Sequence, residues 1–253
     1  MKIHVLGAGG GDRAGHRLPA FLMDDHLLLD AGGAAAALPL QAQDRVEYVL
    51  LSHAHLDHSV GLAFLADNRA LSEETRPITA LALEPVLADL RAHCFNDALW
   101  PDFSRLPTPE NPTVRFRALP SEAESRVGRC SITAIPVHHT VPASGFLLDD
   151  GKVTLAYTGD TGPTVAFWQA LRGTKRLKAV FAECSFPNRM EELAVATGHL
   201  TPALLRRELD RLPASVSVHV FHLKPAFYQE TAEEVARLDG PVRLLTDGGI
   251  LTL

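Results

Sequence analysis

The sequence predicts an α/β (α+β) protein in which sheet layers are covered by helices. Short β-rich runs alternate with helical segments along the whole chain, which is typical of this class. Apolar residues make up 46% of the 253 positions, which is enough for a sizeable core. Neither a repeat nor a low-complexity linker divides the chain, so we expect residues 1–253 to form a single domain.

Strands are expected where apolar or alternating runs are bounded by Gly, Pro or polar clusters. These runs are Ile3–Leu6, Leu27–Asp30, Val46–His53, Ile78–Leu81, Ser131–His139, Val153–Asp160, Ala179–Glu183, Val216–His222 and Val242–Thr246. Helices are expected over residues 60–69, 84–99, 164–172, 201–211 and 230–238. The helix near residue 201 has a clear start, with Thr201 as N-cap and Pro202 at the first helical position. A helix is also expected to begin at Ala34–Ala37, and the prolines of Pro101–Pro112 indicate a loop.

Charge and cysteine content restrict the class of partner and the compartment. The 24 basic and 30 acidic side chains give a net charge of −6, which disfavours nucleic acid as the main partner. No run approaches the roughly 18 apolar residues of a transmembrane helix, and the first residues lack a secretory signal pattern. Cys94, Cys130 and Cys184 are too scattered for a disulfide framework, so we expect a reducing, cytoplasmic location without membrane contact.

The glycine-rich run that follows the first expected strand imitates a dinucleotide-binding motif. Gly7–Gly11 leaves a strand, and Asp30 follows about twenty residues later, as in that motif. However, Asp12 stands where the motif has its last glycine, and Gly15 and Pro19 interrupt the segment that would form the helix. The sequence therefore disfavours a dinucleotide site.

The segment His53-Ala-His55-Leu-Asp57-His58 is the strongest chemical signal in the chain. In extended backbone, residues two apart point the same way, so His53 and His55 are placed to bind one ion. The turn into the following helix directs Asp57 and His58 to a neighbouring point. Imidazole and carboxylate groups suit zinc and similar divalent ions, and the segment therefore predicts metal binding.

Three later strand ends offer further ligands. The alternation Thr133, Ile135, Val137 puts His139 on the apolar side of its strand, although His138 stays open as the alternative ligand. Asp160 ends its strand before a turn, where a carboxylate is placed to bridge two ions. His222 shares the parity of the valines in its strand.

The ligands follow one another along the chain as the His53–His58 segment, a later His, a strand-end Asp and a last His. This series resembles the ligand series of the metallo-β-lactamase superfamily. The resemblance covers nearly the whole chain and implies a metallo-β-lactamase-like αββα sandwich of two mixed β-sheets flanked by helices, with metals at one edge. It implies two divalent ions, zinc first, with manganese or iron as alternatives. One ion would be held by His53, His55 and His139, the other by Asp57, His58 and His222, with Asp160 as the bridge between them.

Four further segments resemble blocks of the class II cyclic-nucleotide phosphodiesterases. They are His93–Phe103, Ala182–Asn188, Gly198–Pro202 and His222–Pro225. The segments around Glu183 and His199 also resemble paired motifs of tRNase Z, a related phosphodiesterase. Both comparisons imply hydrolysis of a phosphodiester, and the first implies a 3′,5′-cyclic nucleotide (cAMP or cGMP) as substrate and a nucleoside 5′-monophosphate as product.

Each step of phosphodiester hydrolysis has a candidate residue in the sequence. Asp57 is placed to orient an activated water, and His199 is a candidate proton donor because a ribose alkoxide is a poor leaving group. Glu183 is expected to hydrogen-bond the His199 ring and raise its pKa. Substrate contacts are expected from Lys224, Trp100 and Asn188.

The alternatives are a tRNase Z-like RNA endonuclease and, from another class, a non-catalytic binding protein. We find no basic, Gly-rich arm for tRNA, which disfavours the endonuclease. Every expected metal ligand is present, which disfavours a protein without catalytic activity. Related folds often dimerise, so a homodimer is an open possibility. Base preference and the native metal are not determined by the sequence.

Overall fold

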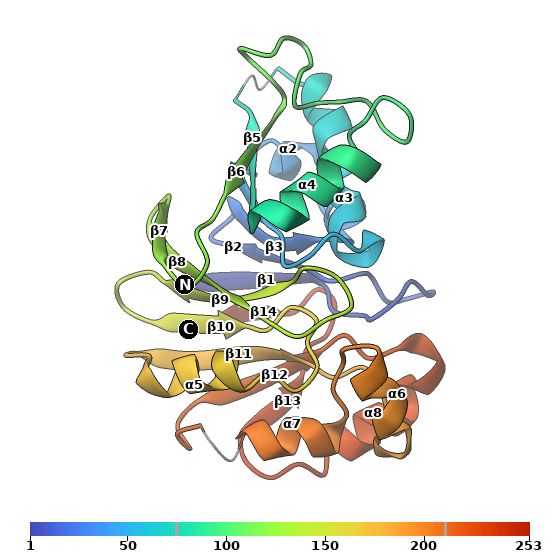
Figure 1. The fold of residues 1–253 in the computed structure, drawn as a ribbon, viewed down its shortest axis with the longest axis vertical. Helices are drawn as coiled ribbons and strands as arrows, with labels where there is room; N and C mark the ends of the chain where they lie inside the picture. Colours follow the sequence, from blue (N-terminus) through green and yellow to red (C-terminus); the bar gives the residue numbers. More distant parts are fainter. Residues whose placement is uncertain (74–75, 210–211) are drawn as a thin grey trace.

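The structure is a computed structural model that describes residues 1–73, 76–209 and 212–253. In that part of the chain, two mixed seven-stranded sheets pack face to face with helices on both outer surfaces (Figure 1). The expected αββα sandwich is confirmed. Within the same residues, no helix has the length and apolar content that a membrane crossing requires.

The first sheet has the strand order β14-β1-β2-β3-β4-β5-β6. Its strands are β1 (Lys2–Gly7), β2 (Ala20–Met23), β3 (Leu27–Ala31), β4 (Tyr48–Leu50), β5 (Ile78–Ala82), β6 (Val114–Ala118) and β14 (Ile250–Thr252). The strands from β3 to β6 run parallel, whereas β14, β1, β2 and β3 pair antiparallel. Because β14 pairs with β1, the two chain ends lie close together (Figure 1).

The second sheet has the order β13-β12-β11-β10-β9-β8-β7. Its strands are β7 (Glu124–Val127), β8 (Cys130–Pro136), β9 (Ser144–Asp149), β10 (Thr154–Tyr157), β11 (Leu177–Glu183), β12 (Ser217–Phe221) and β13 (Val242–Leu244). From β10 to β13 the strands are parallel. The carboxyl ends of parallel strands meet at one edge of a sheet, and polar residues that follow them are therefore brought together.

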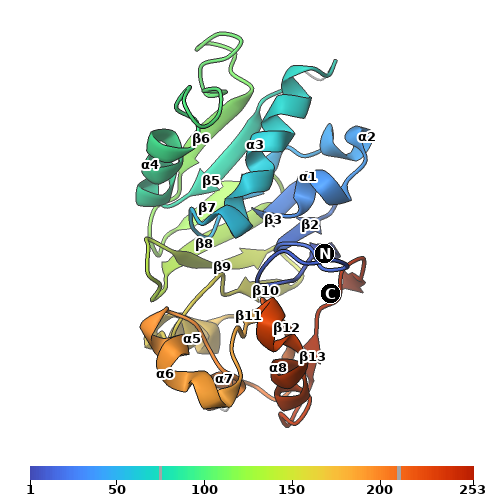
Figure 2. The ribbon, with the colours of Figure 1, turned by 90° about the vertical axis from the view of Figure 1, so that its right-hand side faces the viewer.

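Helices cover the outer face of each sheet (Figure 2). The first sheet carries α1 (Ala34–Ala37), α2 (Leu40–Gln43), α3 (Leu56–Ala70) and α4 (Glu84–His93). The second carries α5 (Val165–Gly173), α6 (Glu191–Ala196), α7 (Pro202–Leu209) and α8 (Tyr228–Val235), with 3₁₀ turns at η1 (Asn188–Met190) and η2 (Pro225–Phe227).

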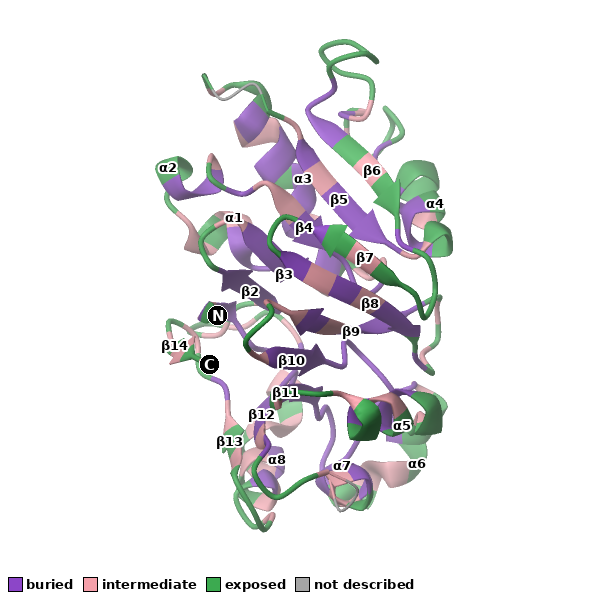
Figure 3. Cartoon of the chain, turned by 90° about the vertical axis from the view of Figure 1, so that its left-hand side faces the viewer, coloured by how far each residue is buried: buried purple, intermediate pink, exposed green. Residues whose placement is uncertain are grey.

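The core between the sheets is centred on aromatic rings. Phe21 of β2 packs edge-on against Tyr157, Phe181 and Phe221 of the second sheet, with ring centroids 5.3–5.7 Å apart. Residues of the central strands β3, β10 and β11 are buried almost throughout, whereas the edge strands β6, β7 and β13 carry exposed or half-buried residues (Figure 3). Large apolar area removed from water at this interface holds the two sheets together.

Several expected boundaries are wrong. Helix α3 begins at Leu56 instead of residue 60, because His55 already has extended N-cap backbone and Asp57 in the first turn complements the helix dipole. Helix α4 ends at His93 instead of residue 99. The strands expected to reach His53, His139 and Asp160 end three residues earlier, and the strand expected to reach His222 ends one residue earlier. All four side chains therefore lie in loops.

Other elements were missed or lie outside the described residues. Strands β2, β6, β7, β9 and β14 and the short helices α2 and α6 have three to six residues each, too few for a periodic pattern. Residues 210 and 211 of the expected helix 201–211 lie outside the described residues. Its start is confirmed, since the Thr201 hydroxyl accepts a hydrogen bond from the Leu204 amide at 3.3 Å.

Candidate metal centre

The first part of the site is one turn of chain between β4 and α3. Beyond β4 the chain bends at Ser52 and brings the rings of His53 and His55 within 3.0 Å of each other, and α3 then carries Asp57 and His58 in its first turn. This turn packs tightly on the chain that follows β3. A Cβ on Gly32 would lie 1.8 Å from the carbonyl oxygen of Asp57. Glycine is therefore required for α3 to approach closely enough to place its side chains.

The second part comes from separate loops of the other sheet. His139 follows β8, Asp160 follows β10, and His222 follows β12. His222 has a left-handed backbone with a φ of +72°, and Gly10 lies against it so closely that a Cβ there would be 2.1 Å from its carbonyl oxygen. The glycine run that imitates a dinucleotide motif therefore packs beneath the site, and residues 8–19 contain no helix.

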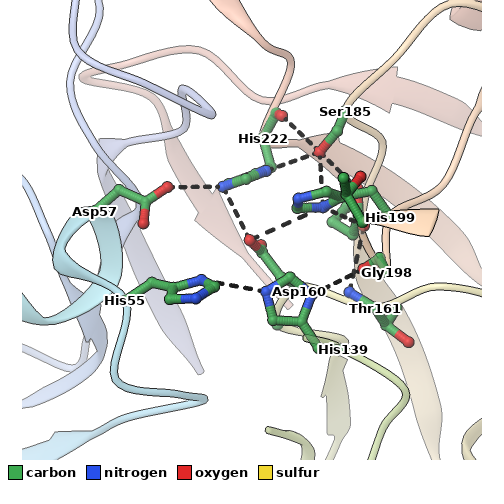
Figure 4. Close-up of polar contacts among 12 residues, drawn as sticks. His55, Asp57, His139, Asp160, Thr161, Ser185, Gly198, His199 and His222 are labelled. Carbon is green, nitrogen blue, oxygen red and sulfur yellow. Dashed lines mark hydrogen bonds and ion pairs between the residues drawn. The ribbon is translucent and has the colours of Figure 1, made fainter. Parts of the chain in front are cut away.

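These side chains form two adjoining clusters. In the first, His55 Nδ1 lies 3.0 Å from His53 Nε2 and 3.2 Å from His139 Nε2. The second contains Asp57, His58, Asp160 and His222. His222 Nε2 lies 3.2 Å from an Asp160 oxygen and 3.4 Å from an Asp57 oxygen (Figure 4). It also lies 3.1 Å from His58 Nε2. The same Asp160 carboxylate oxygen lies 3.8 Å from His53 Nε2, so Asp160 faces both clusters.

This donor set fits divalent cations. Ligands about 2.0–2.2 Å from a tetrahedral zinc ion lie roughly 3.4 Å from one another, which matches the separations within the clusters. Asp160 is buried, with Oδ1 3.2 Å from His58 Nε2 and Oδ2 3.2 Å from His222 Nε2. A buried carboxylate is costly unless a positive charge neutralises it, and a bound cation would do so. His139 donates its other ring nitrogen to the Gly198 carbonyl at 2.9 Å, which leaves Nε2 free for a metal.

The ionisation states of the other ligands, with His58 as the exception, also suit metal binding. Burial lowers the pKa values of His53, His55, His139 and His222, so these rings are neutral at neutral pH, as ligands must be. Burial would raise the pKa of Asp160, but the neighbouring His222 and His58 hold it well below its usual range. The carboxylate is therefore ionised.

Asp30 is a site residue that the sequence analysis did not identify. It is the next-to-last residue of β3, has a left-handed conformation, and accepts hydrogen bonds from His58 Nδ1 and from the Ser52 amide, both at 2.7 Å. Tyr157 and the Ser52 hydroxyl donate to the same carboxylate. Burial lowers the pKa of His58, yet the charges of Asp160 and Asp30 raise it well above its ordinary value. In the sequence, Asp30 could have been found as a site residue because it ends an expected strand, as Asp160 does.

A second group of polar residues adjoins the clusters. Glu183 ends β11, and its Oε1 lies 3.1 Å from Nδ1 of His199, which follows α6. The Ser185 hydroxyl lies 3.1 Å from His199 Nδ1 and 2.9 Å from His222 Nδ1 (Figure 4). Ser185 thus connects the pair to the metal cluster, a role the sequence did not indicate.

The pKa of His199 is lowered, although the sequence analysis expects a raised value. Burial, followed by the charge of Asp160, raises the pKa of Glu183 to about 8, so this carboxyl is protonated at neutral pH and has no charge to offer. Burial lowers the pKa of His199 to about 4. Because the two groups share a hydrogen bond, they hold one proton as a unit at neutral pH.

The three expected substrate contacts lie in different surroundings. Lys224 follows His222 by two residues, and its charge contributes, after burial, to lowering the pKa values of His199 and His222. Asn188 instead accepts a hydrogen bond from the Ala203 amide at 2.7 Å and so caps α7. Trp100 donates its ring N–H to the Ala63 carbonyl at 3.1 Å and packs on the outer side of α3.

Two sheets in an αββα sandwich, with His and Asp clusters at one edge, define a metallo-β-lactamase-fold protein. A family model described as a beta-lactamase superfamily domain matches residues 26–245. The chain belongs to this superfamily.

Three individual proteins resemble this chain over most of its length. The chain is 28% identical, over 285 aligned positions, to a probable 3′,5′-cyclic-nucleotide phosphodiesterase from Yersinia pestis, covering 90% of this chain and 80% of that protein. Unliganded yeast PDE1 has the same fold, with a TM-score of 0.84 at 19% identity over 100% of this chain and 99% of that one. The short form of human tRNase Z follows with a TM-score of 0.72 at 18% identity, over 100% and 99% of the two chains.

Proposed function

We propose that the protein is a metal-dependent phosphodiesterase that opens 3′,5′-cyclic nucleotides to nucleoside 5′-monophosphates. One observation carries the proposal: the buried Asp160 carboxylate faces two clusters of ligands, 3.2 Å from His58 Nε2 and from His222 Nε2 and 3.8 Å from His53 Nε2. Such an arrangement is suited to a pair of cations. The names of the curated relatives supply the substrate class.

His53, His55 and His139 would hold one divalent ion, and Asp57, His58 and His222 the other, with Asp160 between them. Zinc suits this set of imidazoles and carboxylates best, and manganese or iron are the alternatives. Bound ions of this kind neutralise phosphate charge and activate a water molecule.

The chain's own residues complete the reaction. Asp57 would orient the attacking water, because its side chain is 26% exposed while Asp160 and the His222 ring are buried. Lys224 would bind a phosphate oxygen. When the bond from phosphorus to the ribose 3′ oxygen breaks, that oxygen needs a proton, and the Glu183–His199 pair holds one. Glu183 Oε1 contacts Nδ1, so the opposite ring nitrogen, Nε2, is the one available to the leaving group.

Turnover of purified protein on three substrates tests the proposal. Cyclic AMP or cyclic GMP should be converted to the 5′-monophosphate, measured by chromatography, and bis(p-nitrophenyl) phosphate should be hydrolysed as an activated diester. Precursor tRNA is the third substrate, because the fold also resembles human tRNase Z. Cleavage of tRNA without cyclic-nucleotide turnover would favour the RNA endonuclease, and inactivity on all three would favour a binding protein.

We also propose a cytoplasmic location. Cys94, Cys130 and Cys184 are free thiols in the structure, and the last two are buried. Free thiols persist in reducing compartments. Fractionation of cells that express the protein would test this location.

A further inference from the structure

A row of planar side chains leads outward from the candidate proton donor. The Phe186 ring lies edge-on to the His199 ring, with centroids 5.7 Å apart. Phe227 follows at 6.2 Å from Phe186, and the Arg189 guanidinium lies over the Phe227 ring at 5.5 Å from its centroid. Phe186 is buried and Phe227 half-buried, so the row emerges at the surface beside the site.

The row is held by contacts of its own. The Lys224 amide donates to the Ser185 carbonyl at 3.1 Å, which joins the two segments that carry the aromatic rings. Phe227 in turn donates its amide to the Lys224 carbonyl at 3.0 Å. Two hydrogen bonds of 2.9 and 3.0 Å fix the Arg189 guanidinium to the Glu230 carboxylate. These contacts hold the two rings and the guanidinium in place without a ligand.

Three aromatic side chains of the segment His93–Phe103 are packed elsewhere. Phe95 and Phe103 are buried in the core between the first sheet and its helices. Trp100 packs against Phe64 on α3, with ring centroids 5.3 Å apart. The row of rings begins at His199, and its outer ring, Phe227, is hydrogen-bonded through its amide to Lys224. Both His199 and Lys224 face the reacting phosphate in the proposed function.

We propose that Phe186, Phe227 and Arg189 form a nucleobase subsite. The inference rests on the proposed function and deepens it. With the phosphate beside Lys224, the base of the nucleotide lies against the surface end of the row, where the Arg189 guanidinium stacks over the Phe227 ring. Aromatic rings and guanidinium planes stack on any base, and the larger purine ring gains the greater overlap. Purine cyclic nucleotides are therefore preferred over pyrimidine ones.

Product inhibition separates the base from the rest of the ligand. Adenosine 5′-monophosphate and ribose 5-phosphate share a phosphate and a ribose and differ in the base. Stacking of a base on an aromatic ring corresponds to roughly 5- to 150-fold in affinity, so the monophosphate should inhibit the wild-type holoenzyme more strongly by a factor in this range. In Phe227→Ala this ratio should fall close to one, while inhibition by ribose 5-phosphate stays as in the wild type.

Further variants make the result specific. Phe227→Tyr keeps a ring and should restore the ratio, whereas Phe227→Leu keeps apolar volume and should not. Phe64→Ala removes a 45% exposed aromatic ring on α3 and is the matched control, with an unchanged ratio. An unchanged ratio in Phe227→Ala, with cyclic-nucleotide turnover intact, would overturn the subsite and leave the proposed function standing. Absence of cyclic-nucleotide turnover in the wild type would overturn the proposed function itself.

Discussion

The two ligand clusters differ in charge, exposure and support. His53, His55 and His139 are three neutral imidazoles, and the last two are half-buried. The cluster of Asp57, His58, Asp160 and His222 contains two carboxylates and is buried except for Asp57. Charged ligands bind divalent cations more strongly, and partners that orient a ligand strengthen binding further. We therefore expect the acidic cluster, Asp57, His58, Asp160 and His222, to retain its ion under conditions in which the neutral cluster, His53, His55 and His139, has lost its own.

Ligand deletions should have the largest effects. Asp160→Asn removes the carboxylate that faces both clusters, so we expect metal content to fall at both positions and turnover to fall to background. His139→Ala should deplete the neutral cluster alone and leave about one ion per chain. Elemental analysis of dialysed protein together with initial rates checks both results.

His138→Ala is the control for these deletions. His138 adjoins His139 in the chain but is exposed, and its ring is in neither cluster. Its metal content and turnover should match those of the wild type. If His138→Ala and His139→Ala lose metal equally, the assignment of the neutral cluster is wrong.

Removal of the proton donor should have the next largest effect. His199→Ala should slow cyclic-nucleotide hydrolysis by about 10²–10⁴-fold, because general acid catalysis contributes this much when the leaving group is a poor one. Bis(p-nitrophenyl) phosphate expels a phenolate that barely needs a proton, so its rate should change much less. Metal content should remain at the wild-type level. Equal slowing of both substrates would indicate that His199 positions the phosphate instead.

Loss of support for the acidic cluster should weaken metal binding without abolishing it. Asp30→Asn removes the charge that orients His58, and such outer partners typically contribute about 10–100-fold in metal affinity. Tyr157→Phe, which removes one donor to Asp30, should have a smaller effect. Competition with a chelator measures both affinities. A loss confined to the neutral cluster would contradict the pairing of Asp30 with His58.

The part of the site that is local in sequence could be predicted most directly. His53 to His58 are ordered by one strand end and one helix start, so their spacing alone indicates a metal site. His139, Asp160 and His222 come from separate loops, and only the order of strand ends and the family resemblance connected them. Their convergence depends on sheet register, which the sequence does not display.

Features that depend on burial were not predictable in the same way. Asp30 and Ser185 act through hydrogen bonds to His58 and His222, which lie 28 and 37 residues further along the chain. The ionisation of Glu183 was misjudged because a strand-end carboxylate is usually solvated, whereas this one is fully buried next to the charge of Asp160. Phe227, in a 3₁₀ turn of three residues, has no periodic pattern that would single it out.

The pH dependence should give the smallest effect. Burial raises the pKa of Glu183 to about 8, and burial lowers the pKa of His199 to about 4, so between these values the pair holds one proton. A raised carboxyl pKa means that the proton is present below about pH 8 and is lost as the pH rises through that value. Hydrolysis of the cyclic nucleotide should therefore fall about tenfold per pH unit on the alkaline side, while the activated diester should not follow. Glu183→Gln cannot lose this proton, so its slower reaction should lack the alkaline fall. An alkaline fall that persists in Glu183→Gln, or that is equal for both substrates, would assign it to another group.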